Sequence, residues 1–456
     1  MTQNISMEEY SRITPQIEDL TERWSKNCHI DRALYQKYDV KRGLRDANGR
    51  GVLASLTRIS EVKGYTVDGN DTIPCEGMLY YRGYDVRELV NGSLSDKRFG
   101  FEETIYLLLF GELPTAAQLE EFRGLLNDYC GLPGSFVRDV IMKVPTGDMM
   151  NTLARAILTL YCYDNAANDI SLPNALRQCL QLIANTPQLA IYSYQAYRAR
   201  QGHDLYLHVP NPELSMAENI LYLLRADKQY TELEARALDA ALILHADHGS
   251  NNSTFTNHVV SSSGTDTYSA ITASLCSLKG PRHGGANIKV VQMIDDLKAH
   301  VSDWTSEAQI RSYLEDTLAK RAFDGSGLIY GMGHAVYTMS DPRAQILKTH
   351  AKSLAYKKGY DEEYELLCSI ERLAPQVFAE EKHGPKKVCA NVDLFSGLIY
   401  RMLGISEDLY TPLFAIARVP GWCAHRVEEV EFANRIIRPA YKYLGKPQEY
   451  VPLEKR

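Results

Sequence analysis

Amphipathic helical segments dominate the pattern of apolar and polar positions along the chain. Between residues 115 and 129, apolar residues recur on one helical face at Leu119, Phe122 and Leu126. Thr115 and Gln118 stand at the spacing of a capping box, in which each side chain binds a backbone N–H of the other residue. The pattern predicts a helix that begins directly after Thr115.

Several other segments carry the same helical signal. Ser306 and Gln309 repeat the spacing of a capping box ahead of an apolar stripe, and Gly325 and Gly327 close that segment. Further stripes, separated by Gly, Pro or Asn, lie at residues 151–163, 216–225, 232–245, 343–356, 362–373 and 394–403. Strand-like alternation is almost absent, and the one candidate, residues 77–83, predicts a small hairpin ahead of the helices. We therefore expect a mainly α fold with a small N-terminal β element.

Glycines suggest where the chain divides. Residues 41–75 contain Gly43, Gly49, Gly51, Gly64 and Gly69, and we interpret this segment as a linker between an N-terminal arm and the body. A weaker boundary lies near residue 285, where Gly284-Gly285 would serve as a hinge.

Composition excludes some classes of protein. The chain has 456 residues, 45% of them hydrophobic, and a formal net charge of −7, so it can bury a large core but offers no basic surface to nucleic acid. An anionic substrate would have to meet a local group of cations. Nine cysteines without a C-x-x-C pair do not form a disulfide framework, the acidic N-terminus lacks a targeting pattern, and the apolar stretches are too short for a membrane span. The default expectation is a cytoplasmic protein.

Three segments place an ionisable residue in glycine-rich or turn-like surroundings. They are Gly280-Pro-Arg-His283-Gly-Gly-Ala-Asn287, Gly331-Met-Gly-His334-Ala-Val-Tyr-Thr-Met-Ser-Asp-Pro-Arg343 and Asn391-Val-Asp393-Leu-Phe-Ser-Gly397. Glycine beside a histidine lets a ligand approach the imidazole closely, although glycine also punctuates ordinary turns. Asp393 opens an apolar helical run, so it is either an N-cap or, in a dry site with a raised pKa, a general base. Arg343 and Arg418 are either exposed residues on helix surfaces or residues whose guanidinium groups bind a small carboxylate through two hydrogen bonds.

Two other motifs in the sequence have partial matches to known sites. His245 and His248 lie three residues apart with His258 ten residues further on, which allows zinc, but no third ligand on a rigid element is evident; a polar helix face or a substrate contact at His248 is the alternative. A dinucleotide fingerprint fails, because Val336 stands where Gly331-x-Gly333 would need a third glycine or alanine.

Taken together and in this order, these segments resemble the citrate synthase family. The resemblance covers about residues 76–445 and includes further matches: Tyr81-Arg-Gly-Tyr-Asp85, Leu109-Phe-Gly-Glu-Leu-Pro114, His245-Ala-Asp-His248, Ala417-Arg418 and Arg438-Pro439. It implies a mainly helical two-domain fold, with a large domain from residues 76–285 and 409–456 and a small domain from 286–408. Residues 1–75 would form an N-terminal arm and linker. The active site would lie in the cleft between the two domains.

The resemblance also implies an enzyme that condenses acetyl-CoA with oxaloacetate and water, giving citrate and CoA through an enol and citryl-CoA. Asp393 would remove the methyl proton, His283 would stabilise the enol and His334 would polarise the ketone of oxaloacetate. The oxaloacetate carboxylates would be held by His248, Arg343, Arg418 and, from the neighbouring subunit of a homodimer, Arg438. The CoA adenine would contact the backbone of Leu328, Ile329, Gly331, Met332 and Gly333. No metal or cofactor is implied beyond the substrates.

Two departures from the family pattern concern CoA. Met332 stands where an aromatic residue is common, and Thr338 where many members carry a basic residue that faces a CoA phosphate. The alternatives left open are a 2-methylcitrate synthase that takes propionyl-CoA, a zinc hydrolase built on His245, His248 and His258, and a non-catalytic helical scaffold.

Overall fold

The computed structural model describes residues 6–46, 51–68, 71–381, 387–432 and 435–456. It divides into two units, one made of Thr57–Ile437 and the other of Met1–Leu56 together with Arg438–Arg456. Gly49 and Gly69 of the glycine-rich segment lie outside the described residues. Within the described part, none of the helices combines the length and apolar character that crossing a membrane requires.

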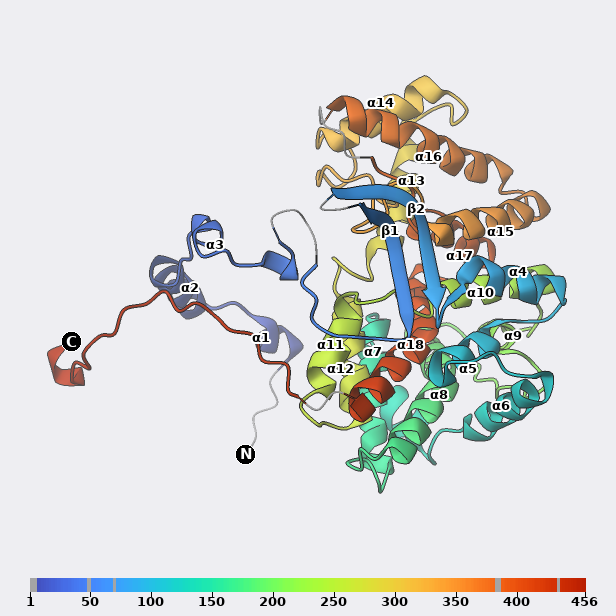
Figure 1. Cartoon of the computed structure of the whole chain (residues 1–456), viewed down its shortest axis with the longest axis horizontal. Helices are drawn as coiled ribbons and strands as arrows, with labels where there is room; N and C mark the ends of the chain where they lie inside the picture. Colours follow the sequence, from blue (N-terminus) through green and yellow to red (C-terminus); the bar gives the residue numbers. More distant parts are fainter. Residues whose placement is uncertain (1–5, 47–50, 69–70, 382–386, 433–434) are drawn as a thin grey trace. The chain divides into compact units, whose positions relative to one another are not determined.

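The larger unit is built almost entirely of helices (Figure 1). Its helices are α4 (Val86–Ser95), α5 (Phe101–Phe110), α6 (Ala116–Tyr129), α7 (Met149–Leu160), α8 (Leu172–Arg200), α9 (Met216–Leu224), α10 (Glu232–His245), α11 (Asn252–Ser261), α12 (Thr267–Lys279), α13 (Ala286–His300), α14 (Glu307–Leu318), α15 (Pro342–Lys358), α16 (Asp361–Glu381), α17 (Asp393–Met402) and α18 (Tyr410–Phe432). The smaller unit contains α1 (Met7–Ser11), α2 (Pro15–Asn27) and α3 (Ala33–Lys37). The mainly α fold expected from the sequence is confirmed.

A single small sheet precedes the helices of the larger unit, as the sequence predicted. Strands β1 (Ser60–Asp68), β2 (Asp71–Tyr81) and β3 (Tyr84–Asp85) pair antiparallel in that order. The register of β1 and β2 shifts between Lys63 and Tyr65, at Gly64. The strands begin at Ser60, so residues 60–68 and 71–75 of the expected linker belong to paired strands.

Helix α18 lies at the centre of the larger unit. It packs against α8, α5, α10, α11 and α12, and its Trp422 is fully buried. The helix continues through Pro420 and Gly421, two residues that weaken an isolated helix. Most of the α18 side chains around them are buried, so packing against the neighbouring helices stabilises this part of the helix. Helices α13 to α17 pack on one another and gather at one end of this unit in Figure 1.

The predicted helix starts are largely as expected. Thr115 and Gln118 form the full capping box of α6. At α14, Ser306 accepts from the Gln309 N–H, but the Gln309 side chain accepts from Ser302 and Asp303 rather than from the N-cap backbone. The second capping box is therefore only half formed.

Candidate active site

His334 lies in the segment between Gly331 and Asp341, called the His334 loop below, which begins with a tight turn containing two glycines. Gly331 and Gly333 have φ values of 82° and 88°, which residues with a Cβ rarely adopt. The loop pairs with the strand-like segment before α17, since Gly333 N–H donates to Cys389 O at 2.7 Å and Asn391 N–H donates to Gly331 O at 2.9 Å. This pairing brings His334 and Asp393 into neighbouring segments although they are far apart in sequence.

Backbone groups fix the tautomer of His334. Its Nδ1 accepts from the N–H groups of Val336 at 3.0 Å and Tyr337 at 3.1 Å. Because a backbone N–H only donates, Nδ1 carries no proton and the proton of the neutral ring is on Nε2. His334 is thereby prepared as a hydrogen-bond donor through Nε2.

His248 and Tyr337 complete an aromatic cluster around His334. The His334 ring stacks on Tyr337 with centroids 4.7 Å apart, and the His248 ring meets His334 edge-on at 5.1 Å. His248 Nε2 lies 3.3 Å from the Tyr337 hydroxyl, which donates to Met78 O at 3.1 Å. Burial, followed by the charge of Arg343, holds the pKa of His248 well below its usual value, so this ring is neutral.

The hairpin formed by β1 and β2 contacts the His334 loop directly. Gly77 N–H donates to the Ser340 hydroxyl at 3.1 Å, and that hydroxyl binds the Glu76 carboxylate. A Cβ on Gly77 would stand 2.1 Å from Ser340 O, and one on Gly64 would stand 2.6 Å from Val336 O. These two glycines let β1 and β2 reach the loop, so the hairpin belongs to the structure that holds the site.

We expect Gly77→Ala to disturb the site through this contact. The added methyl group forces the loop away from the hairpin and lowers the free energy of unfolding by about 1–3 kcal/mol. Thermal unfolding measures the loss. Gly124→Ala is the matched control, because a Cβ there meets nothing within 4 Å and removes a helix glycine. A Gly77→Ala protein as stable as Gly124→Ala would contradict the contact.

Arg343 is positioned by the residue that caps its helix. Asp341 is the N-cap of α15 and accepts a hydrogen bond from the Arg343 backbone N–H. Its carboxylate also accepts hydrogen bonds from the Arg343 side chain, from Nε at 3.0 Å and from Nη2 at 2.7 Å. Arg343 is only 3% exposed. Although burial lowers its pKa, the Asp341 carboxylate more than offsets this and raises the pKa above its usual value. The guanidinium is therefore a permanent buried cation with Nη1 outside the ion pair.

Asp393 is the first residue of α17 and does not cap it. Val392 occupies the N-cap position and no side chain makes a cap hydrogen bond there, so the N-cap interpretation of Asp393 is wrong. Burial raises the pKa of Asp393 to about 6, while the charge of Arg343 partly opposes this and that of Asp341 adds to it. The result is a carboxylate that is ionised near neutral pH yet more basic than an ordinary aspartate.

His283 lies in the turn before α13 and is oriented by Ser253 of α11. Ser253 N–H points at His283 Nε2 at 3.3 Å, and the Ser253 hydroxyl lies 2.9 Å from the same nitrogen. Since Nε2 accepts from the backbone, the proton of the neutral ring is on Nδ1. Burial, with a contribution from Arg418, lowers the pKa of His283 to about 4. Sequence reasoning assigned Ser253 no role, because a serine in a first helical turn is common.

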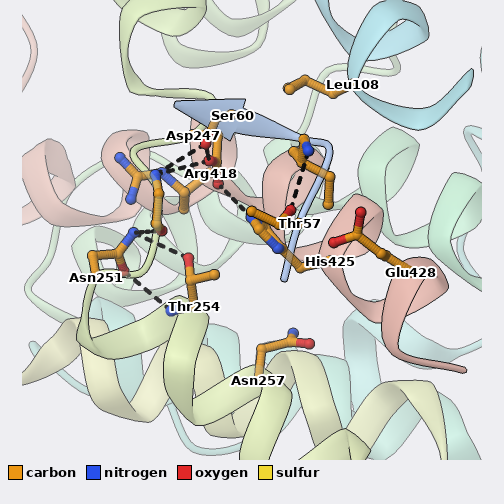
Figure 2. A network of polar contacts seen from close by, with 12 residues as sticks. Thr57, Ser60, Leu108, Asp247, Asn251, Thr254, Asn257, Arg418, His425 and Glu428 are labelled. Atoms are coloured by element: carbon orange, nitrogen blue, oxygen red, sulfur yellow. Dashed lines mark hydrogen bonds and ion pairs between the residues drawn. The ribbon is translucent and has the colours of Figure 1, made fainter. Parts of the chain in front are cut away.

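Arg418 is a second buried cation, on α18. It is 1% exposed, and its Nε donates to His245 O at 2.6 Å. Its guanidinium carbon lies over the Phe414 ring, 4.8 Å from the ring centroid. Among the described residues its Nη2 has no hydrogen-bond partner. Burial lowers the pKa of Arg418 to about 10, and the nearby Asp247 carboxylate opposes that loss; Figure 2 shows the two side chains beside each other. A buried donor without a partner is costly, so Arg418 is suited to receive an anionic ligand.

The three histidines of the zinc hypothesis have separate surroundings. His245 packs against Phe414, His248 against Tyr337, and His258 against His425 and Glu429. Within the described parts of the chain, no group of three His, Cys, Asp or Glu residues is arranged to hold a metal ion.

The remaining residues of the predicted site are residues 328–333, expected to contact CoA, and Arg438. In residues 328–333, Leu328 is 52% exposed whereas the Ile329 and Met332 side chains are buried. Arg438 is exposed and belongs to the smaller unit.

The fold and the site define a class: a mainly helical enzyme whose buried arginines and neutral imidazoles suit a small anionic substrate. The family model described as citrate synthase, C-terminal domain, matches residues 44–440. A citrate synthase of Synechocystis sp. is 37% identical over 411 residues, 89% of this chain and 92% of the relative. A 2-methylcitrate synthase of Shewanella oneidensis is 33% identical over 420 residues, 92% of this chain and all of that relative.

Solved structures agree with these relatives. Citrate synthase from Pyrobaculum aerophilum superimposes with a TM-score of 0.74 at 32% identity, covering 91% of this chain and 95% of that one. The Thermoplasma acidophilum enzyme, in a ternary complex with carboxymethyl coenzyme A and oxaloacetate, also gives 0.74, at 28% identity over 91% and 99% of the two chains. The chain belongs to the citrate synthase family.

Proposed function

We propose that this protein is a citrate synthase that joins acetyl-CoA to oxaloacetate and releases citrate and CoA. The observation that carries the proposal is the pKa of Asp393, raised to about 6 by burial, in the segment that pairs with the His334 loop. An aspartate of this kind is a base at neutral pH, and a donor imidazole with a fixed tautomer stands on the paired loop.

Asp393 removes a proton from the methyl group of acetyl-CoA. The carboxylate is a much weaker base than the carbanion it would generate. Each unit of difference between their pKa values costs about 1.4 kcal/mol, so the base alone is insufficient. His283 supplies the remaining stabilisation, because its neutral Nδ1–H donates to the thioester oxygen as negative charge develops there. Its pKa of about 4 keeps the ring neutral at the pH where Asp393 is ionised.

Oxaloacetate is held and polarised by the second group of residues. Nε2–H of His334 donates to the ketone oxygen and makes the carbonyl carbon electrophilic. Nη1 of Arg343 and Nη2 of Arg418 bind the carboxylates, and His248 joins them by exchanging its contact with Tyr337 for a substrate oxygen. Condensation gives citryl-CoA, and hydrolysis of its thioester releases citrate and CoA.

The other expectations drawn from the family enter as parts of the same proposal. The small domain, residues 286–408, closes on oxaloacetate and completes the acetyl-CoA site. The protein acts as a cytoplasmic homodimer in which Arg438 reaches the neighbouring site. The adenine of CoA lies against residues 328–333, where Leu328 offers an exposed apolar side chain. The reaction takes place without a metal or cofactor.

The pH dependence of kcat/KM follows from these assignments. We expect activity to fall below about pH 6, because protonation of Asp393 removes the base, whose pKa is raised to about 6. His283 stays neutral down to about pH 4 and adds no limb in this window. Initial rates between pH 5 and 8 measure the profile, and a flat rate down to pH 5 would exclude Asp393 as the base.

Propionyl-CoA is the second candidate substrate, because the Shewanella oneidensis relative is named 2-methylcitrate synthase. One extra methylene changes binding by only about 1–3 kcal/mol, so a small change in pocket shape decides between the two acyl groups. An assay of thiol release with oxaloacetate and either acyl-CoA tests reaction and substrate together. The proposal predicts a higher kcat/KM with acetyl-CoA, and release with neither thioester would refute it.

A further inference from the structure

A small cavity lies among α5, α6, α8 and α9, and none of the residues of the proposed active site lines it. Helix α5 packs on α6 and α9, and α8 packs on the same two helices; the four gather at the lower right of Figure 1. The cavity has a volume of about 50 Å³, which is room for about four groups of the size of a water molecule. Its walls are mainly apolar, but Glu102, Arg123 and Gln188 also line it.

Gln188 offers this cavity a hydrogen-bond acceptor without a partner. The residue is 8% exposed, and its Nε2 donates to the Tyr192 hydroxyl at 2.8 Å. The amide cannot be turned round, because the Tyr192 hydroxyl gives its single proton to His208 O at 2.6 Å and can only accept from Gln188. Gln188 Oε1 is buried and has no hydrogen-bond partner among the described residues. A ligand that donates to Oε1 therefore gains binding free energy there.

Glu102 is a buried carboxylate close to a second one, Asp239. The two are 6% and 4% exposed, and Glu102 Oε1 accepts from Met216 N–H at 2.6 Å. Burial raises the pKa of both carboxyl groups, that of Asp239 to about 8, and the charge of Glu102 adds to the rise at Asp239. Within the described part of the chain, no basic side chain forms a hydrogen bond with either carboxylate. A cation that reached Glu102 would offset this buried negative charge.

Arg123 of α6 places a cation at the same cavity. Its one ion pair in the described chain is with the exposed Glu120, at a long N–O distance of 3.8 Å. The charge of Arg123 lowers the pKa of Glu102, although burial raises it more, so the guanidinium lies near the carboxylate without forming an ion pair with it. A guanidinium binds a carboxylate through two parallel hydrogen bonds. The cavity thus has one group for a cation and one for an anion.

We propose that this cavity binds a small α-amino acid with a short aliphatic side chain. The ammonium group donates to Glu102 and to Gln188 Oε1, and the carboxylate accepts from Arg123. The side chain lies against the apolar wall, which includes Leu126 and Leu223. A zwitterion pairs both charges of the cavity at once, whereas a simple anion would leave the buried Glu102 without a partner. The proposal does not depend on the proposed function.

Three small molecules separate the groups that the cavity recognises. Alanine carries both charges, ethylamine carries only the ammonium and propionate only the carboxylate. Each has a methyl group whose protons report binding in saturation-transfer NMR. We expect alanine to bind with a Kd on the order of 1 mM, and ethylamine and propionate each about tenfold more weakly. If water alone fills the cavity, none of the three binds; that result, or equal binding of alanine and propionate, overturns the proposal.

Two substitutions remove the charges one at a time. Glu102→Gln keeps an acceptor for Met216 N–H, and we expect it to weaken alanine and ethylamine about tenfold while propionate is unchanged. Arg123→Gln should weaken alanine and propionate but leave ethylamine unchanged. Glu103→Gln is the matched control, because Glu103 follows Glu102 on α5 and is also buried, but it pairs with Arg98 and does not line the cavity. It should leave the binding of all three molecules unchanged.

The contradicting results are equally specific. Alanine affinity that stays the same in folded Glu102→Gln or in Arg123→Gln overturns the proposal. Arg123 is partly exposed, so Arg123→Gln gives a result even if Glu102→Gln does not fold. Arg418→Lys tells this cavity apart from the buried arginines of the proposed active site. Alanine affinity should be unchanged in Arg418→Lys, and its loss there would place alanine in the other site and overturn the proposal.

Discussion

Asp393→Asn is expected to lower kcat by about a thousandfold while the protein stays folded, since a general base contributes about 10²–10⁴ to rate. The amide has the size of the carboxylate but cannot accept the methyl proton. The assay is thiol release with saturating acetyl-CoA and oxaloacetate. Asp361→Asn is the control, because Asp361 also opens a helix, α16, but is exposed.

The same substitution should make the protein more stable. The pKa of Asp393 is raised in the folded state, so between about pH 4 and 6 the folded protein holds more protons than the unfolded chain, and stability falls as pH rises through this window. At pH 7.5 the buried charge opposes folding in full, and asparagine removes that charge. Lower activity together with a higher unfolding temperature is the predicted pair of results; unchanged kcat would refute the assignment.

His283→Ala is expected to lower kcat by about 10²–10³, the usual effect of removing one donor to a developing oxyanion. The ring is neutral because burial lowers its pKa to about 4, and Ser253 leaves only Nδ1–H available as a donor. The KM for oxaloacetate should change little, because His283 serves the thioester. Steady-state kinetics with each substrate varied in turn measure this separation.

The control for His283→Ala is His300→Ala, which removes an exposed imidazole from α13. It should retain full activity. A His283→Ala protein with normal kcat, or one whose only defect is the KM for oxaloacetate, would contradict the enol-stabilising role.

Local signals in the sequence predicted some helices well. The capping box of α6 and the stripes of α9, α10, α15 and α17 depend on contacts within a few residues, so they are visible without the fold. The central helices α8 and α18 were not predicted. Residues 182–196 of α8 are all buried, which removes the amphipathic period, and Pro187 and Pro420 resemble breaks in an isolated sequence.

Asp393 shows how far the local sequence can predict the role of a site residue. Its position before an apolar run is that of an N-cap, and only the structure places Val392 there instead. The same holds for strand β1, which was interpreted as linker partly because of Gly64, a residue that is glycine for a tertiary reason, its contact with the His334 loop. The motifs marked the segments that matter, but the charge state of each group depends on neighbours far away in sequence.

The most direct test of the account is a crystal structure with oxaloacetate and carboxymethyl coenzyme A, the pair bound in the Thermoplasma acidophilum relative. We predict that His334 Nε2 lies within hydrogen-bond distance of the oxaloacetate ketone, with Arg343 and Arg418 on its carboxylates. Asp393 and His283 should both contact the carboxymethyl end of the analogue. Ligands bound elsewhere, or a carboxymethyl group out of reach of either residue, would contradict the account.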